Sequence, residues 1–148
     1  AVAPDNNRAV PLEKIRAPRL PNTKVISIKL RHNPAGKVLD RATFDGLVAL
    51  CRQHGIWLFS DEVYRGLERT SHLQLPAAVD AYEKGLSLGV MSKAYGLPGL
   101  RVGWIASRDR DLLYHMERIK HYLSICNANP SEHLAMIALK RTLGLVPP

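Results

Sequence analysis

The sequence predicts an α/β fold in which parallel strands alternate with helices. Two apolar runs with strand character, residues 24–30 and 56–60, lie on either side of a segment with helical periodicity. The first run is rich in β-branched residues and is expected to be a mostly buried strand. The second is almost continuously apolar, which is typical of a parallel strand covered on both faces. Strand, helix and strand in this order form one right-handed crossover unit.

Residues 1–23 are expected to form an irregular lead-in to this unit. Four prolines lie in this segment and disfavour a continuous helix or a central strand, so only a short helical turn over residues 12–15 is expected. A compact domain seldom begins with so long an unanchored segment. The chain is therefore expected to be part of a larger protein.

The first helix is predicted between Asp40 and Gly55. Asp40 is a favourable N-cap residue, and Gly55 suits the position just after the last turn. Between them, apolar residues recur at helical spacing: Phe44, Leu47, Val48 and Cys51. This periodicity predicts a helix that packs one face against the strands.

The second half of the chain continues with strands and helices. After a polar stretch with a helical turn expected at 77–82, strand character returns at 86–91 and again at 101–107. Apolar residues at helical spacing then mark an amphipathic helix: Leu112, Met116, Ile119 and Leu123. Asn129 as a cap, Pro130 at N1 and Glu132 at N3 predict a last helix that runs to about Gly144.

Composition favours an ordinary globular protein. The chain has 148 residues and a net charge of +8, but acidic residues interrupt most of the basic groups, so a solvated surface is favoured over a nucleic-acid site. No signal peptide is visible and no apolar run is long enough to cross a bilayer, so no membrane partner is expected. Cys51 and Cys126 lack metal-ligand spacing and indicate free thiols in a reducing compartment, so we expect a cytoplasmic protein without a metal site.

Five polar residues are placed where they could form a site: Asn33, Asp61, Tyr64, Lys93 and Arg101. They follow the predicted strands, and the carboxyl ends of parallel strands are where open α/β sheets bind ligands. Each residue alone has a structural explanation as a turn former, a helix cap, a packed ring or a surface cation. An ammonium at the end of a buried strand, however, loses solvation unless a function or a partner compensates it. The joint occurrence of the five residues therefore favours a binding site.

Three segments make this indication specific: Asn33–Gly36, Ser60–Tyr64 and Ser92–Gly103. In this order they resemble the class I/II aminotransferases, which are fold-type I pyridoxal-phosphate enzymes. The resemblance covers most of the chain from Val25 onward. It implies a three-layer, mostly parallel sheet flanked by helices, with residues 24–148 forming part of the large cofactor-binding domain.

The resemblance implies pyridoxal 5′-phosphate as the cofactor and a role for each site residue. Lys93 would hold the cofactor aldehyde as a Schiff base and, once displaced by substrate, would move a proton between Cα and the cofactor. Asp61 would keep the pyridine nitrogen protonated, which sustains the electron sink. Asn33 and Tyr64 would donate hydrogen bonds to the phenolic oxygen, and Arg101 would bind the phosphate through its fork of donors.

The implied function is amino transfer from an α-amino acid through a quinonoid intermediate, in a homodimer whose subunits share each active site. Members of the family are far longer than 148 residues. Their upstream segment, which carries a phosphate-binding loop, and their small C-terminal domain are not identifiable in this sequence. The chain is therefore expected to be the central and later part of the cofactor domain.

Departures from the family pattern leave other outcomes open. Val90 stands where a serine commonly contacts the phosphate, Arg31 replaces a common proline, and Ala35 replaces a common threonine. A weaker resemblance to the branch that contains capreomycidine synthase and arginine-oxidising enzymes allows oxidation, hydroxylation or elimination on the same cofactor. A further alternative is a truncated, noncatalytic structural or binding module, because site residues can persist in a chain that lacks half of its pocket.

Overall fold

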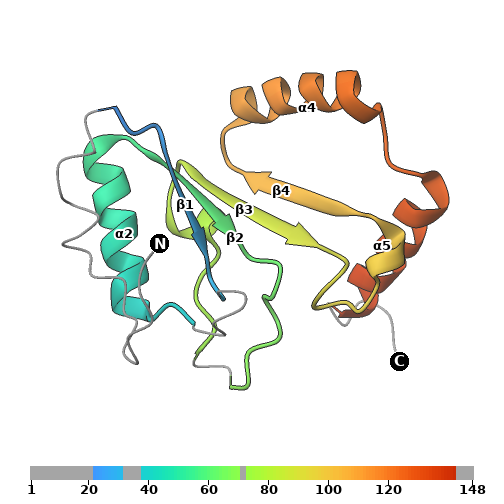
Figure 1. The fold of residues 1–148 in the computed structure, drawn as a ribbon, viewed down its shortest axis with the longest axis horizontal. Coiled ribbons are helices and arrows are strands. Elements are labelled where there is room, and N and C mark those ends of the chain that lie inside the picture. Colours follow the sequence, from blue (N-terminus) through green and yellow to red (C-terminus); the bar gives the residue numbers. More distant parts are fainter. Residues whose placement is uncertain (1–21, 32–37, 71–72, 143–148) are drawn as a thin grey trace, which may run out of the picture.

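The chain folds around one sheet, described here from a computed structural model. The structure describes three stretches: residues 22–31, 38–70 and 73–142. Four strands lie in the order β1-β2-β3-β4 (Figure 1), with the bounds β1 Val25–Lys29, β2 Trp57–Asp61, β3 Gly85–Val90 and β4 Gly103–Ser107. The first three run parallel and β4 returns antiparallel to β3. A mostly parallel sheet flanked by helices is therefore confirmed.

Helix α2 (Arg41–His54) connects β1 to β2 and forms as its capping residues predict. The Asp40 carboxylate accepts a hydrogen bond of 2.8 Å from the backbone N–H of Thr43. Gly55 ends the helix in the left-handed conformation, with φ 64°, a geometry that costs glycine little. The helix buries Phe44, Leu47, Val48, Leu50 and Cys51. Three of them belong to the core that packs on the sheet: Phe44, Val48 and Cys51.

The main core lies between α2, the short helix α3 (Ala78–Ala81) and one face of the sheet. Its buried members come from α2, from β2 and the residue before it, and from α3 with its flanking residues: Phe44, Val48, Cys51, Ile56, Leu58, Leu75, Ala78 and Tyr82. The Tyr82 hydroxyl donates to the Cys51 carbonyl at 3.1 Å, so even the polar end of this ring has a partner. This core holds β1, β2 and β3 in register.

The two strand runs are less buried than the sequence predicts. In β1, Ile26 and Ile28 turn toward the core, but Val25 is 51% exposed. In β2, Leu58 and Ser60 are buried, whereas alternate residues are only half-buried. The prediction of burial on both faces is therefore wrong within the described residues, because α2 and α3 pack on one face of these strands.

The later elements form largely where they are predicted. A 3-10 helix, η2 (Pro98–Leu100), precedes β4, which begins at Gly103 rather than at Arg101. Helix α4 is Arg110–Ser124 and α5 is Asn129–Thr142, so Asn129 already lies inside the last helix. The expected end of that helix at Gly144 lies outside the described residues, as do residues 1–21 of the expected lead-in.

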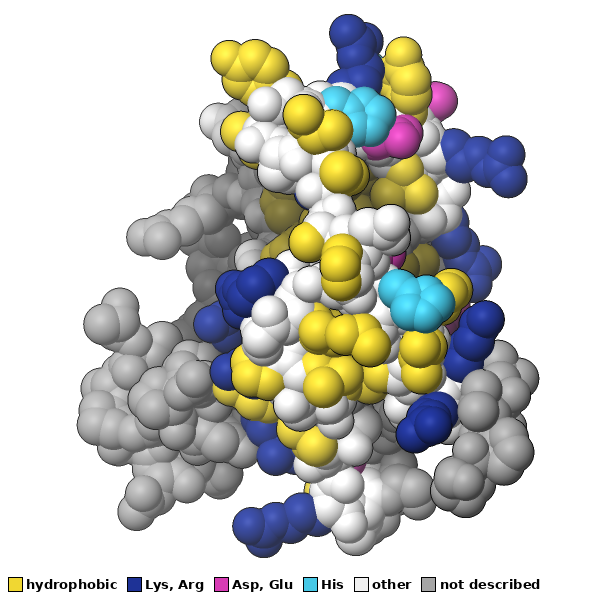
Figure 2. Space-filling model, turned by 90° about the vertical axis from the view of Figure 1, so that its right-hand side faces the viewer, with side chains coloured by type: hydrophobic (Ala, Val, Ile, Leu, Met, Phe, Trp, Pro, Cys, Tyr) yellow, Lys and Arg dark blue, Asp and Glu magenta, His cyan; other side chains and the backbone are white. Residues whose placement is uncertain are grey.

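The side of the molecule formed by α4 and α5 carries apolar side chains that the described residues leave uncovered (Figure 2). On α4, Ile119 and Leu123 are 60% and 73% exposed, although their spacing predicts a packed face.

No helix in the described part of the chain is both long enough and apolar enough to cross a bilayer.

Candidate functional site

The candidate site lies at the edge where the three parallel strands end. Lys29 of β1, Asp61 of β2 and Leu88 of β3 are neighbours in the strand register, so the loops that follow these strands leave from the same edge (Figure 1). The loop after β2 carries Tyr64, and the loop after β3 carries Lys93 and Arg101. Asn33 falls in a segment outside the described residues, and its predicted role stays a prediction.

Strand β2 ends with Asp61, whose half-buried carboxylate accepts a hydrogen bond of 3.3 Å from the Val63 N–H in the loop that follows. Tyr64 follows in a turn closed by the Arg65 N–H to Glu62 carbonyl bond of 2.9 Å. Within the described residues the Tyr64 hydroxyl has no hydrogen-bond partner. It is therefore available to donate to a bound group.

Lys93 lies in the turn directly after β3. The Gly96 N–H donates to the Lys93 carbonyl at 3.0 Å, and the Leu97 N–H donates to the Met91 carbonyl at 2.9 Å, so the backbone of this turn is well defined. The lysine is exposed, and its Nζ lies 6.0 Å from the centre of the Tyr64 ring. Among the residues that the structure describes, no hydrogen bond or ion pair engages this amine. The structure thus brings Lys93 and Tyr64 together, from strand ends that are far apart in sequence.

Arg101 belongs to the same closed loop as Lys93, because the Met91 N–H donates to the Val102 carbonyl at 3.0 Å and joins the two ends of that loop. Its guanidinium is exposed, and Nη1 donates to the Pro98 carbonyl at 3.1 Å. The backbone of Arg101 is left-handed, with φ 55°, which costs a residue with a side chain roughly 1–2 kcal/mol. Such local strain is concentrated at functional sites.

Glu62 is a buried residue of the site region. It lies within the Ser60–Tyr64 motif, but the sequence indicates no role for it. It is 5% exposed, and its carboxylate accepts hydrogen bonds from Arg65 Nε at 2.7 Å, the Ala78 N–H at 2.9 Å and Ser87 Oγ at 2.9 Å. The only local signal was a second carboxylate directly after a buried strand. Its partners Ala78 and Ser87 are too distant in sequence for a motif to connect them.

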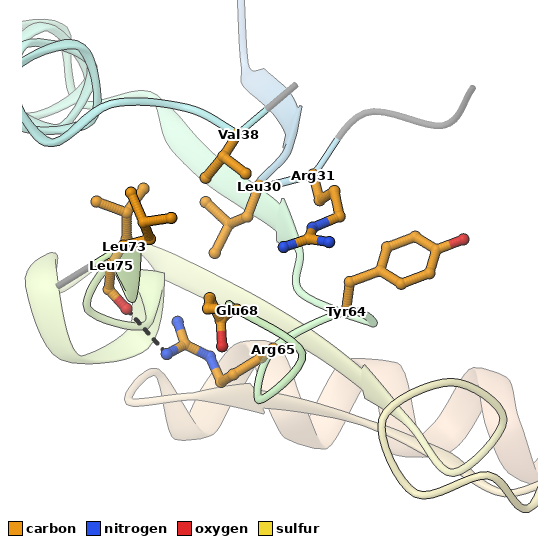
Figure 3. A pocket seen from close by; sticks show the side chains of 8 residues that line it. All are labelled: Leu30, Arg31, Val38, Tyr64, Arg65, Glu68, Leu73 and Leu75. Carbon is orange, nitrogen blue, oxygen red and sulfur yellow. Dashed lines mark hydrogen bonds between the residues drawn. The ribbon is translucent and has the colours of Figure 1, made fainter. Parts of the chain in front are cut away.

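Two hollows near this edge, formed by described residues, are too small for a cofactor of the expected size. One, of about 10 Å³, holds room for a single water. It is lined by Leu30, Arg31, Val38, Tyr64, Arg65, Glu68, Leu73 and Leu75 (Figure 3), and the Tyr64 hydroxyl points away from it. Arg31, the departure from the family's proline, donates from Nη2 to the Leu67 carbonyl at 3.3 Å and so ties the end of β1 to the loop after β2.

The side chains at the open edge fit the cofactor that the resemblance implies. A carboxylate, a phenol and an amine gather there, and the phenol and the amine lack partners among the described residues. These are a partner for a ring nitrogen, a donor for a phenolic oxygen and a nucleophile for an aldehyde. Arg101 adds a guanidinium with the geometry that a phosphate requires.

Known proteins are similar to this chain in sequence and in fold. Residues 4–143 match the family model described as aminotransferase class I and II. The arginine–pyruvate transaminase of Pseudomonas aeruginosa is 34% identical over 80% of this chain and 30% of its own length. Capreomycidine synthase of Streptomyces vinaceus is 33% identical over 98% of this chain and 37% of its own length.

A solved structure, described as a PLP-dependent aminotransferase from Streptococcus suis, superposes with a TM-score of 0.80. The two proteins are 34% identical, and the matched region covers 89% of this chain and 34% of the Streptococcus suis chain. The chain therefore spans about a third of the length of these relatives. The match over nearly the whole sequence, with the fold described above, means that this chain belongs to the aminotransferase class I and II family.

Proposed function

We propose that this chain is the cofactor-holding part of a pyridoxal-phosphate-dependent aminotransferase that acts on an α-amino acid. The observation that carries the proposal is the amine of Lys93, which makes no hydrogen bond or ion pair with the described residues and lies 6.0 Å from the centre of the Tyr64 ring, at the strand edge where Asp61 ends β2. The relatives support the reaction class, because two of them are described as a transaminase and as a PLP-dependent aminotransferase.

Each residue has a physical role in holding the cofactor. Lys93 would hold it covalently through its amine, which is a nucleophile for the cofactor aldehyde. Asp61 pairs with the ring nitrogen, and Tyr64 and Asn33 donate hydrogen bonds to the phenolic oxygen. Arg101 binds the phosphate, and its rigid fork of donors suits that group better than a lysine would. When bound, the cofactor supplies an electron sink for the bond broken at the substrate Cα.

The same lysine has a second role after substrate binds. An ε-amine that is free of the cofactor would stay on the short turn of Lys93 at the edge of the sheet. From there it can remove the proton at the substrate Cα as a general base. The exposed position of Lys93 is consistent with a group that must exchange partners in each cycle.

The proposal extends to the assembly and location of the protein. The exposed apolar side chains on α4 and α5 support the burial of this side in a homodimer of the kind that the family resemblance implies. Cys51 and Cys126 are both free thiols, which supports a reducing, cytoplasmic location. Light scattering of the purified protein and fractionation of cells that express it at native levels test these two points.

The cofactor proposal is tested by adding pyridoxal phosphate to the protein, reducing with borohydride and mapping the labelled peptide. We expect the label on Lys93 and its loss in Lys93→Ala. Lys140→Ala is the matched control, because Lys140 is an exposed lysine in the last turn of α5. Equal labelling of the wild type and Lys93→Ala would refute the proposal. The reaction class is tested by incubating the protein with pyridoxal phosphate, an amino acid and a keto acid. Transfer of the amino group to the keto acid supports transamination, whereas consumption of oxygen would indicate an oxidase.

A further inference from the structure

Glu62 is a buried carboxylate with a complete set of partners next to the proposed site. Three donors from three parts of the chain converge on it: the Arg65 guanidinium in its own loop, the Ala78 N–H at the start of α3 and the Ser87 hydroxyl on β3. The Arg65 ion pair is short, at 2.7 Å, and the Glu62 side chain is only 4% exposed. A buried carboxylate is retained in this way only when charge and hydrogen bonds compensate its lost solvation.

These bonds fix the loop that carries two proposed cofactor ligands. Glu62 lies between Asp61 and Tyr64 in the chain, and its own N–H donates to the Leu88 carbonyl of β3 at 3.0 Å. Arg65, on the other side of Tyr64, donates from Nη1 to the Leu75 carbonyl at 2.9 Å. The backbone is thus anchored on both sides of Tyr64, and both anchors include the Glu62–Arg65 pair.

The Tyr64 side chain makes no hydrogen bond of its own within the described part of the chain. Among the described residues, the charged group over its ring is the Lys93 amine. The position of its hydroxyl therefore depends on the backbone of the loop. Because the loop in turn depends on Glu62, a change at Glu62 is expected to reach the cofactor through Tyr64.

A hollow lies beside this network. A space of about 80 Å³, lined in part by Glu62, Arg65, Ser87 and Trp104, lies next to the ion pair and can hold water. Arg65 Nη2 is buried and lacks a hydrogen-bond partner among the described residues. An Arg65 released from Glu62 could therefore rearrange toward water in this space without unfolding the core.

We propose that Glu62 is a positioning residue, which fixes Asp61 and Tyr64 for the cofactor through Arg65, Ser87 and the start of α3. The inference rests on the proposed function, because it assigns a role in the same site. Glu62 itself faces away from the open edge. Its side chain lies on the face of the sheet that carries α3, whereas Asp61, the preceding residue, lies on the other face.

The test is the Glu62→Gln variant, which keeps the shape of the side chain but removes its charge and one acceptor. One of the three donors then meets an amide NH₂, so the network cannot be fully satisfied. We expect the Kd for pyridoxal phosphate to rise by roughly tenfold, the lower end of the losses seen when the partners that orient metal ligands are removed. We also expect the pH midpoint of the bound cofactor's absorption band to shift, because the ring's hydrogen-bond partners move.

Two control variants separate positioning from loss of stability. Glu83→Gln makes the same chemical change in an exposed pair with Arg52, where the atoms are 3.3 Å apart, and should leave both measurements unchanged. Val48→Ala removes buried core volume under α2 and should lower stability without shifting the midpoint. A Glu62→Gln variant that behaves like Val48→Ala, with lower stability and an unchanged midpoint and Kd, would overturn the inference.

A double-variant comparison tests the route through Tyr64. If Glu62 acts by placing that hydroxyl, Tyr64→Phe should raise the Kd less in the Glu62→Gln background than in the wild type. Independent, multiplicative effects would contradict this route. Normal labelling of Lys93 together with an unchanged Glu62→Gln variant would reject the inference alone, whereas a wild type that fails to bind the cofactor would reject the proposed function and the inference with it.

Discussion

The Gly85→Ala substitution is predicted to lower the free energy of unfolding by about 2–6 kcal/mol. Gly85 begins β3 directly beneath α3, and a Cβ there would lie 2.0 Å from the Ala78 carbonyl oxygen and 2.9 Å from the Tyr82 carbonyl oxygen. Ordinary contact begins near 3.4 Å, and both obstacles are backbone atoms. Helix α3 must therefore move away as a unit. Overpacking of this kind costs about 1–3 kcal/mol, and loss of the buried bond from the Ala78 N–H to Glu62 adds about 1–3 kcal/mol.

Urea denaturation followed by far-ultraviolet circular dichroism measures this change. Gly99→Ala is the matched control, because a Cβ on Gly99 meets no atom within 4 Å. It should change the unfolding free energy by less than about 0.5 kcal/mol, as is usual for open surface positions. If Gly85→Ala were as stable as Gly99→Ala, the close packing of α3 on β3 would be wrong, and with it the bond that connects α3 to Glu62. A weakened cofactor affinity in Gly85→Ala would extend the same reasoning to the site.

Three further predictions concern single side chains. Hydrogen bonds from the backbone and hydroxyl of Thr43 lower the pKa of Asp40 below 3.8, so Asp40→Ala should cost about 1 kcal/mol at neutral pH. That difference should shrink as the pH falls through the lowered pKa, because the charged cap is then lost from the folded state; urea titrations across this range check it. Arg101→Gly should be more stable than Arg101→Ala by about 1 kcal/mol, since only glycine accepts φ 55° without strain, while both variants bind pyridoxal phosphate more weakly. Burial raises the pKa of Cys51 to about 11, so a thiol reagent at mildly alkaline pH should label Cys126 quickly and Cys51 only after denaturation; rapid labelling of both would contradict the buried position.

The features that the sequence predicted well are those with local causes. Asp40 and Gly55 delimit α2 because a cap and a left-handed terminus are decided by a few neighbouring residues. The ends of β2 and β3 were also predictable, since strand character stops there and polar residues begin. Lys93 and Tyr64 could therefore be assigned to one edge of the sheet before their approach was seen.

The features that the sequence did not predict depend on contacts between distant segments. The spacing of Ile119 and Leu123 indicates a helix, but it cannot show whether another element covers them, and both are exposed in the described structure. The same cause explains why the predicted burial of β1 and the predicted coverage of β2 on both faces are wrong: a strand's own residues do not show which elements pack on it. Glu62 is the clearest case, because a carboxylate after a strand is ordinarily solvated. Only the fold brings Ala78 and Ser87 to it.

The alternation of side chains along a strand explains how two adjacent carboxylates can have different roles. Successive residues of a strand point to opposite faces, so Asp61 and Glu62 divide between the half-open face and the face packed on α3. A shift of one residue in the register of β2 would exchange them. It would turn the Asp61 carboxylate to the face packed on α3 and the Glu62 carboxylate to the half-open face. The bonds from Glu62 to Ser87 and to the Ala78 N–H exist in only one of these registers. The buried carboxylate therefore also selects the register that presents Asp61 to the open edge.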